Sequence, residues 1–371
     1  MRSSCSLLQR TLSLRSKLAP SPVSPWPPVR TAFDRWLMSE LDELRLVPFS
    51  VSRYTSGHWL AKALDLTFAA QRMTDRLLAT PADRTATHGD RQLIQGYADG
   101  VVELLDACNG LRERMGELRK YTGSMYAASH YLDQDPRQER ISSGVAGRAT
   151  VALAECEATE KRCDELDKLR DFNLRKLGEK IAGNAEPAAR DHQASADAST
   201  AELREALRGT LAMTQLAVAA TWIAVSFNAR RGLPAAQPGR QASGWGGKLR
   251  DLHKAVKLEF EKRRRGGAAV LDELEAAASC VRSLRRAVAH GVGREVGMSV
   301  RLARRSGREL EERMRSLGQS VDQVYSQLIR MRVMLLDKLT GAKTYDIAPP
   351  ECMRKIRHPT HWWTCVNLQY P

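Results

Sequence analysis

GTLAMTQLAVAATWIAVSFNA, residues 209–229, is a stretch of about twenty residues without a charged side chain, bounded by Arg208 and Arg230. A helix that is apolar all round is either the core of a large bundle or a membrane span. The Leu, Ile, Val and Phe side chains of this stretch favour membrane insertion by only about 3 kcal/mol in total. Its polar side chains oppose insertion: Thr214, Gln215, Thr221 and Ser226. We therefore expect a buried central helix, and a single marginal membrane span at residues 211–227 is the alternative.

The sequence on both sides of this stretch has helical periodicity. Apolar side chains recur every three or four residues, and no strand-like alternation of useful length appears. The pattern predicts helices over residues 57–79, from about 88 to 123, 138–181, from about 201 into the uncharged stretch, from 245 or 248 to 265, 268–289 and 309–339. Residues 121–132 are expected to form a separate turn of helix. The predicted fold class is all-α, an elongated multi-helix bundle of long antiparallel helices with one uncharged central helix.

Composition divides the chain of 371 residues into three parts. Residues 1–50 are expected to be disordered or transit-like, residues 51–341 to form the helical bundle, and residues 342–371 to be an irregular tail. Segments poor in large apolar side chains near 184–200 and 232–247 predict linkers within the bundle. Apolar residues make up 43% of the chain, which is ample material for a core.

The first thirty residues contain five Lys and Arg, seven Ser and no Asp or Glu. We expect the protein in the cytoplasm or at an endomembrane surface. The composition of the first thirty residues also matches an organelle transit peptide, so plastid import is an alternative; a disordered basic tail or a misassigned start codon has the same composition. The seven cysteines include no close CxxC pair, which favours a reducing compartment.

The formal net charge of +15 is concentrated in two stretches, residues 248–265 and 281–315. Positive stripes attract anionic surfaces and acidic partners, although solvated helix faces have the same composition. Neither stretch has the interleaved aromatic residues or Gly-rich signatures of RNA-binding modules, so no nucleic-acid partner is expected. The expected partners are other proteins and an anionic membrane surface, with Arg263, Arg264 and Arg265 as the charges to reverse in a test.

The chain has no sequence motif for nucleotide, dinucleotide, zinc-protease or acyl-transfer chemistry. Near the C-terminus, Cys352, His358, His361 and Cys365 are residue types that bind zinc when four of them converge. Their spacing, C-x5-H-x2-H-x3-C, is not that of a usual zinc finger. We therefore predict that the protein is not an enzyme, with no catalytic, cofactor-binding or metal-binding residues and no cofactor.

The last predicted helix, residues 309–339, carries apolar side chains at three- and four-residue steps, close to a heptad seam. Neighbouring helices of the same bundle cover such a seam more often than a partner chain does. Under the second interpretation, Leu328 and Leu335 would contact a partner chain.

Several segments together resemble one protein family. YADGVVELLDACNGLRERM at 97–115 follows a Trp-containing helix with WLAKALD at 59–65. Further segments follow in order: NARRGLP at 228–234, KAVKLEFEKRRRGGAAVLDELEAAASCVRSL at 254–284 and VDQVYSQLIRMRVMLLDKL at 321–339. The set resembles the plant BYPASS-related, or ROH-like, family over about residues 57–341. The Ser/Arg/Pro-rich start and the residues after 341 depart from the family pattern.

The resemblance implies a plant protein that regulates root and shoot development. Members of the family are linked to restraint of a mobile, root-derived growth-arrest signal, and one branch is linked to the exocyst in secretion. The family has no agreed active site, so the resemblance assigns no role to any residue of this chain. The expected function is that of a non-enzymatic developmental regulator, and a membrane-associated adaptor of exocyst-dependent secretion is the alternative.

Overall fold

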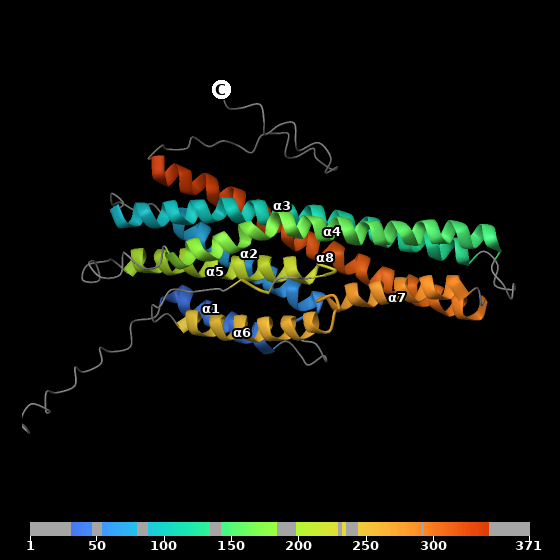
Figure 1. Ribbon diagram of the computed structural model, residues 1–371. Coiled ribbons are helices and arrows are strands. Elements are labelled where there is room, and N and C mark those ends of the chain that lie inside the picture. Colours follow the sequence, from blue (N-terminus) through green and yellow to red (C-terminus); the bar gives the residue numbers. More distant parts are fainter. Residues whose placement is uncertain are drawn as a thin grey trace, which may run out of the picture.

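The computed structural model describes residues 31–46, 54–79, 88–133, 142–183, 198–228, 232–234, 244–290 and 293–340 (Figure 1). Within these ranges the chain forms eight α-helices and no strand: α1 Ala32–Leu46, α2 Gly57–Ala79, α3 His88–Leu132, α4 Ser143–Gly183, α5 Ala198–Ala224, α6 Gly244–Arg265, α7 Asp272–His290 and α8 Gly293–Thr340. The prediction of an all-α bundle of long helices is confirmed.

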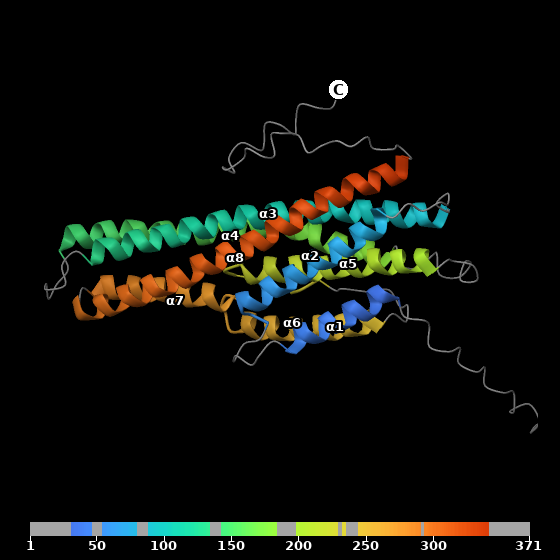
Figure 2. The same cartoon turned by 180° about the vertical axis from the view of Figure 1, so that it is seen from behind.

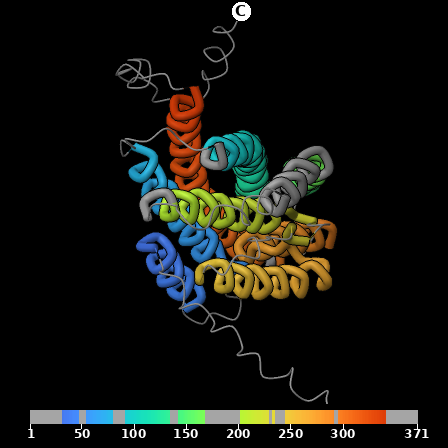
Figure 3. The backbone as a smooth tube through the Cα atoms, turned by 90° about the vertical axis from the view of Figure 1, so that its left-hand side faces the viewer, coloured from blue at the N-terminus to red at the C-terminus, as the bar shows by residue number. Residues whose placement is uncertain are grey.

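The helices are arranged around α5. Helices α3 and α4 form a long antiparallel pair on one side of α5, and α1 and α6 lie on the opposite side (Figure 3). Helix α8 runs diagonally across the bundle and packs against α2, α3 and α7 (Figure 2). Buried residues from all eight described helices belong to one hydrophobic cluster, so the described elements share a single core.

The uncharged stretch is the centre of that core, because every residue from 209 to 227 is buried. Its threonine hydroxyl groups are satisfied by backbone carbonyl groups: within α5, Thr214 donates to that of Thr210 at 2.7 Å and Thr221 to that of Ala217 at 2.8 Å. Thr210 donates to the carbonyl of Ala70 in α2 at 3.2 Å. Such bonds remove most of the cost of burying a hydroxyl group. Among the described residues, no helix combines the length and the apolarity needed to cross a bilayer.

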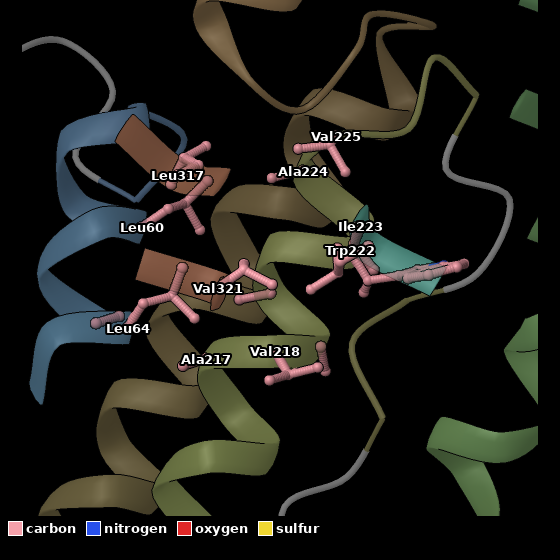
Figure 4. Packing of buried hydrophobic residues seen from close by; sticks show 14 of the residues in the cluster. Leu60, Leu64, Ala217, Val218, Trp222, Ile223, Ala224, Val225, Leu317 and Val321 are labelled. Atoms are coloured by element: carbon pink, nitrogen blue, oxygen red, sulfur yellow. The ribbon is translucent and has the colours of Figure 1, made fainter. Parts of the chain in front are cut away.

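Side chains from α2, α5 and α8 meet at the C-terminal half of α5 (Figure 4). Leu60 and Leu64 of α2 and Val321 of α8 are fully buried there, on the side of α5 that carries Ala217 and Ala224. Helices α2 and α8 are far apart in sequence, so this contact joins the first part of the described chain to its last helix.

Helix α1 lies inside the segment predicted to be disordered or transit-like, so that prediction is wrong for Ala32–Leu46. Phe33, Leu37 and Leu41 are fully buried against the rest of the bundle. These three large apolar side chains are four residues apart, a spacing that indicates a helix. The prediction missed it because it assigned the whole of residues 1–50 from the Ser/Arg/Pro-rich composition of its first part. Residues 1–30, which carry the transit-like composition, lie outside the described residues.

Two helices are longer than predicted. Residues 121–132 are not a separate turn but continue α3, because Tyr121, Met125 and Ala128 extend its buried stripe. Helix α8 begins at Gly293, sixteen residues before the predicted start at residue 309. In this added part, Val296 and Val300 supply a narrow buried stripe between arginines. The predicted linkers at 184–200 and 232–247 lie mostly outside the described residues, and their last residues, 198–200 and 244–247, are helical instead.

The apolar seam of α8 is internal. Leu328 and Leu335 are both fully buried, as are most of the seam residues at three- and four-residue steps before them. Helices α2, α3 and α7 cover this seam. The interpretation in which Leu328 and Leu335 contact a partner chain is therefore wrong.

Helix α6 ends at Arg265, directly before Gly266 and Gly267, as the sequence predicts. Gly267 has a φ of 69°, a left-handed conformation that is readily available only to glycine. The N–H of Gly267 donates to the carbonyl of Arg264 at 3.0 Å, and this turn leads the chain toward α7.

Gly209 of α5 permits the close approach of α1. A Cβ atom at this position would lie 2.6 Å from Cε1 of Phe33 and 3.0 Å from Cδ2 of Leu37. We expect Gly209→Ala to lower the free energy of unfolding by about 1–3 kcal/mol, as overpacking of a close-packed core does. The measurement is urea unfolding followed by circular dichroism.

Gly116→Ala is the matched control, because Gly116 lies in the interior of α3 and a Cβ atom there meets nothing within 4 Å. This substitution should stabilise the protein by about 0.5–1 kcal/mol, the usual difference between alanine and glycine inside a helix. Equal effects of the two substitutions would contradict the close packing of α1 on α5.

Candidate interaction surface

The α7–α8 tip, defined as residues 282–290 and 295–308, is one of two strongly basic parts of the described chain. It carries seven arginines and a single acidic residue, Glu295. The tip lies at one end of the bundle, where α7 ends and α8 begins (Figure 1). Such a concentration of one sign creates a positive potential that extends about 10 Å into solution at moderate ionic strength.

An exposed stripe runs along the tip on α8. Met298 is 57% exposed and Leu302 is 54% exposed, although both side chains are large and apolar. Arg301, Arg305 and Arg308 are exposed at helical spacing on the same side of α8. The stripe therefore combines two apolar side chains with three cations, the pattern of a helix that lies at a membrane interface.

Some arginines of the tip are engaged in ion pairs. Arg282 pairs with Glu275, Arg285 with Glu157 at 3.1 Å, Arg304 with Asp133 and Arg305 with Glu309 at 2.9 Å. By contrast, Arg286, Arg301 and Arg308 make no ion pair with any residue that the structure describes. As far as the described residues go, these three guanidinium groups are available to an external anion.

A shallow groove with a volume of about 380 Å³ lies between the two helices of the tip and is open to solvent. Ser283, Arg286 and His290 line it from one face of α7. Glu295, Met298 and Ser299 line it from α8. The groove thus contains a cation, two hydroxyl groups, an imidazole and one carboxylate beside the exposed stripe.

The second basic stretch, on α6, is mostly occupied by contacts within the protein. Lys248 pairs with Asp42 of α1, and Arg263 pairs with Asp272 at the start of α7. Arg265 lies 3.7 Å from Glu261. Reversing the charge of Arg263 would therefore disturb the junction of α6 and α7, which makes it an unsuitable test of an external surface.

A buried polar network connects α3, α4 and the end of α5. Arg114 is fully buried, pairs with Asp167, and donates to Ser226 and to the carbonyl of Cys163. Its guanidinium carbon lies 4.5 Å from the centre of the Trp222 ring. Burial raises the pKa of Asp167, and its pairing with Arg114 opposes that rise. The network fixes the position of α4 on the core rather than forming an open site.

The thiols of the core are not suited to nucleophilic chemistry. Burial raises the pKa of Cys108, Cys156 and Cys163 to about 12, so the reactive thiolate is scarce at neutral pH. No group of three or more potential metal ligands occurs among the described residues. The candidate zinc ligands at 352, 358, 361 and 365 lie outside those residues.

The sequence predicted the basic stretch that contains the tip but not the exposed apolar pair within it. Met298 and Leu302 are four residues apart, with Arg301 and Arg305 at the same spacing. This interleaving of apolar and basic side chains indicates an amphipathic helix face. The predicted start of the helix at residue 309 left these residues outside any helix, so the face was not predicted.

Comparison with protein-family models, with characterised proteins and with solved structures finds no match to this chain.

Proposed function

We propose that this chain is a non-enzymatic helical protein that docks on an anionic membrane surface through the α7–α8 tip. The observation that carries the proposal is the exposed stripe, in which Met298 and Leu302 lie between arginines. A lipid surface offers negative head groups to the arginines and an apolar layer to these two side chains.

The energetic contributions favour reversible attachment. Each cation close to an anionic surface contributes about 1 kcal/mol, and insertion of two apolar side chains adds to this. Arg286, Arg301 and Arg308, which make no ion pair with a described residue, would supply about 3 kcal/mol, which gives a weak association that depends on salt. This is the behaviour of a peripheral protein.

At the level of the organism, we propose a plant regulator of root and shoot development of the BYPASS type. The support is the ordered series of segments that resemble this family over residues 57–341. In this proposal, membrane docking places the bundle where it meets protein partners that control a root-derived growth-arrest signal.

The second candidate is an adaptor of exocyst-dependent secretion. Its support is an apolar pair on the outer side of α8, at the end opposite to the tip: Val333 is 51% exposed and Leu336 is 45% exposed. A partner protein could bind this pair while the tip contacts the membrane.

Vesicle binding tests the proposed function. We expect Arg301→Gln combined with Arg308→Gln to weaken binding to phosphatidylserine-containing vesicles about 30-fold, because two surface charges contribute about 2 kcal/mol. The measurement is co-sedimentation of the purified chain with vesicles at low salt.

Arg250→Gln combined with Arg332→Gln is the matched control. Both arginines are exposed but lie outside the tip, on α6 and on the far end of α8. This variant has the same net charge and should bind nearly as well as the parent protein. If the two double variants lose binding equally, net charge rather than the tip mediates attachment, and the proposal is rejected.

A further inference from the structure

We infer that the groove between α7 and α8 binds the phosphorylated polyol head group of a membrane lipid. This inference rests on the proposed function and deepens it, because it adds a specific recognition site to a surface that otherwise attracts any anionic lipid. The groove opens beside Met298, which both lines it and belongs to the exposed stripe.

The donors in the groove fit a phosphate group. Arg286 makes no ion pair with any described residue, so its fork of N–H groups is available to phosphate oxygens. It donates to Ser283 at 3.3 Å, so this hydroxyl already accepts a bond and retains its own O–H to donate. His290 follows on the same face of α7, and its ring N–H is a further donor.

The facing helix adds hydrogen-bonding groups of both kinds. Ser299 has no side-chain partner among the described residues and lines the groove from α8. Glu295 would repel a bare phosphate, but its carboxylate can accept hydrogen bonds from the hydroxyl groups of a polyol ring. Donors on α7 and an acceptor on α8 therefore fit a ligand that carries both a phosphate and neighbouring hydroxyl groups.

The position of the groove indicates a lipid rather than a soluble sugar phosphate. Leu302 lies one turn further along α8 from Met298 and is 54% exposed. Insertion of these two side chains into the head-group layer would bring the groove to the depth of the lipid phosphates. A free head group would gain only the polar contacts, whereas a lipid would gain the apolar contacts of the stripe as well.

The test compares vesicles of equal surface charge that contain either phosphatidylinositol 4-phosphate or phosphatidylserine. We expect the parent protein to bind the first at least about tenfold more tightly, since charge-assisted hydrogen bonds add to the general attraction. Soluble inositol phosphates should compete only weakly, at concentrations far above those of the lipid.

Ser283→Ala combined with Ser299→Ala is the decisive variant, because it changes no charge. It should lose most of the preference for phosphatidylinositol 4-phosphate and bind phosphatidylserine vesicles as before. Arg286→Gln should also lose the preference, whereas Arg332→Gln, which removes the same charge at the far end of α8, should keep it.

Three outcomes bear on this inference and on the proposed function. If the parent protein binds both vesicle types equally, the groove is not a recognition site, while docking through the tip stands. If soluble inositol phosphate competes as strongly as the lipid, the ligand is a free phosphate and the lipid assignment is overturned. If neither vesicle is bound, the proposed function itself fails.

Discussion

Asp167→Ala is expected to lower the free energy of unfolding by about 3–5 kcal/mol, the range measured when one partner of a buried ion pair is removed. Arg114 is fully buried, and a guanidinium group cannot lose its proton in a protein. Without Asp167, the positive charge would keep only Ser226, one carbonyl oxygen and the Trp222 ring as partners. Urea unfolding of the purified protein measures the change.

Arg114→Met is expected to cost less, about 1–3 kcal/mol, although it removes the larger side chain. Asp167 is 22% exposed and can become protonated, so the charge left behind can be neutralised. A carboxyl with a higher pKa in the folded state binds its proton more tightly there, so its contribution to stability falls as pH rises. Burial already raises the pKa of Asp167, and loss of the arginine raises it further.

The stability difference between Arg114→Met and the parent protein should therefore shrink as the pH falls from 7 to 5. Arg162→Met is a control, because Arg162 also pairs with carboxylates of α3 and α4 but is 43% exposed. Its effect should stay below about 1 kcal/mol. A larger loss of stability in Arg114→Met than in Asp167→Ala would contradict this account of the network.

Leu328→Ala is expected to destabilise the protein by about 2–5 kcal/mol, because Leu328 is fully buried in the seam of α8 and truncation leaves a cavity. The nearby Val333→Ala should change the free energy of unfolding by no more than about 0.5 kcal/mol, since Val333 is 51% exposed. Thermal unfolding followed by circular dichroism compares the two variants.

The same pair of variants separates folding from partner binding. If the second candidate function holds, Val333→Ala should weaken co-purification with exocyst subunits while the protein stays folded. A stable, folded Leu328→Ala protein would show that the seam is not part of the core, which would contradict the packing of α8 against α2, α3 and α7.

Much of the fold could be predicted from periodicity. The apolar stripes of α2, α3 and α6 are wide enough to specify helices, and glycine residues at 266 and 267 gave the end of α6. Periodicity shows which side of a helix is apolar but not what covers it. The sequence alone therefore does not show whether neighbouring helices or a partner chain cover the seam of α8; the contacts of α8 with α2, α3 and α7 show that neighbouring helices do.

The functional features were harder to predict because they depend on contacts between distant segments. Arg114 lies between Leu111 and Leu118 on the buried stripe of α3, a position that indicates burial. The sequence could not show that Asp167, fifty-three residues later, lies against it. Likewise, an ion pair occupies Arg263 on α6, whereas Arg301 on α8 has none with a described residue, although both lie in basic stretches.

The most direct test of docking through the α7–α8 tip is hydrogen exchange of the parent protein with and without phosphatidylserine vesicles. We predict slower exchange on vesicles in peptides covering residues 282–308, where the exposed stripe meets the lipid. Peptides covering residues 248–265 of α6 should exchange at the same rate in both samples. Slower exchange confined to α6, or a tip that exchanges unchanged while the protein is bound, would contradict the account.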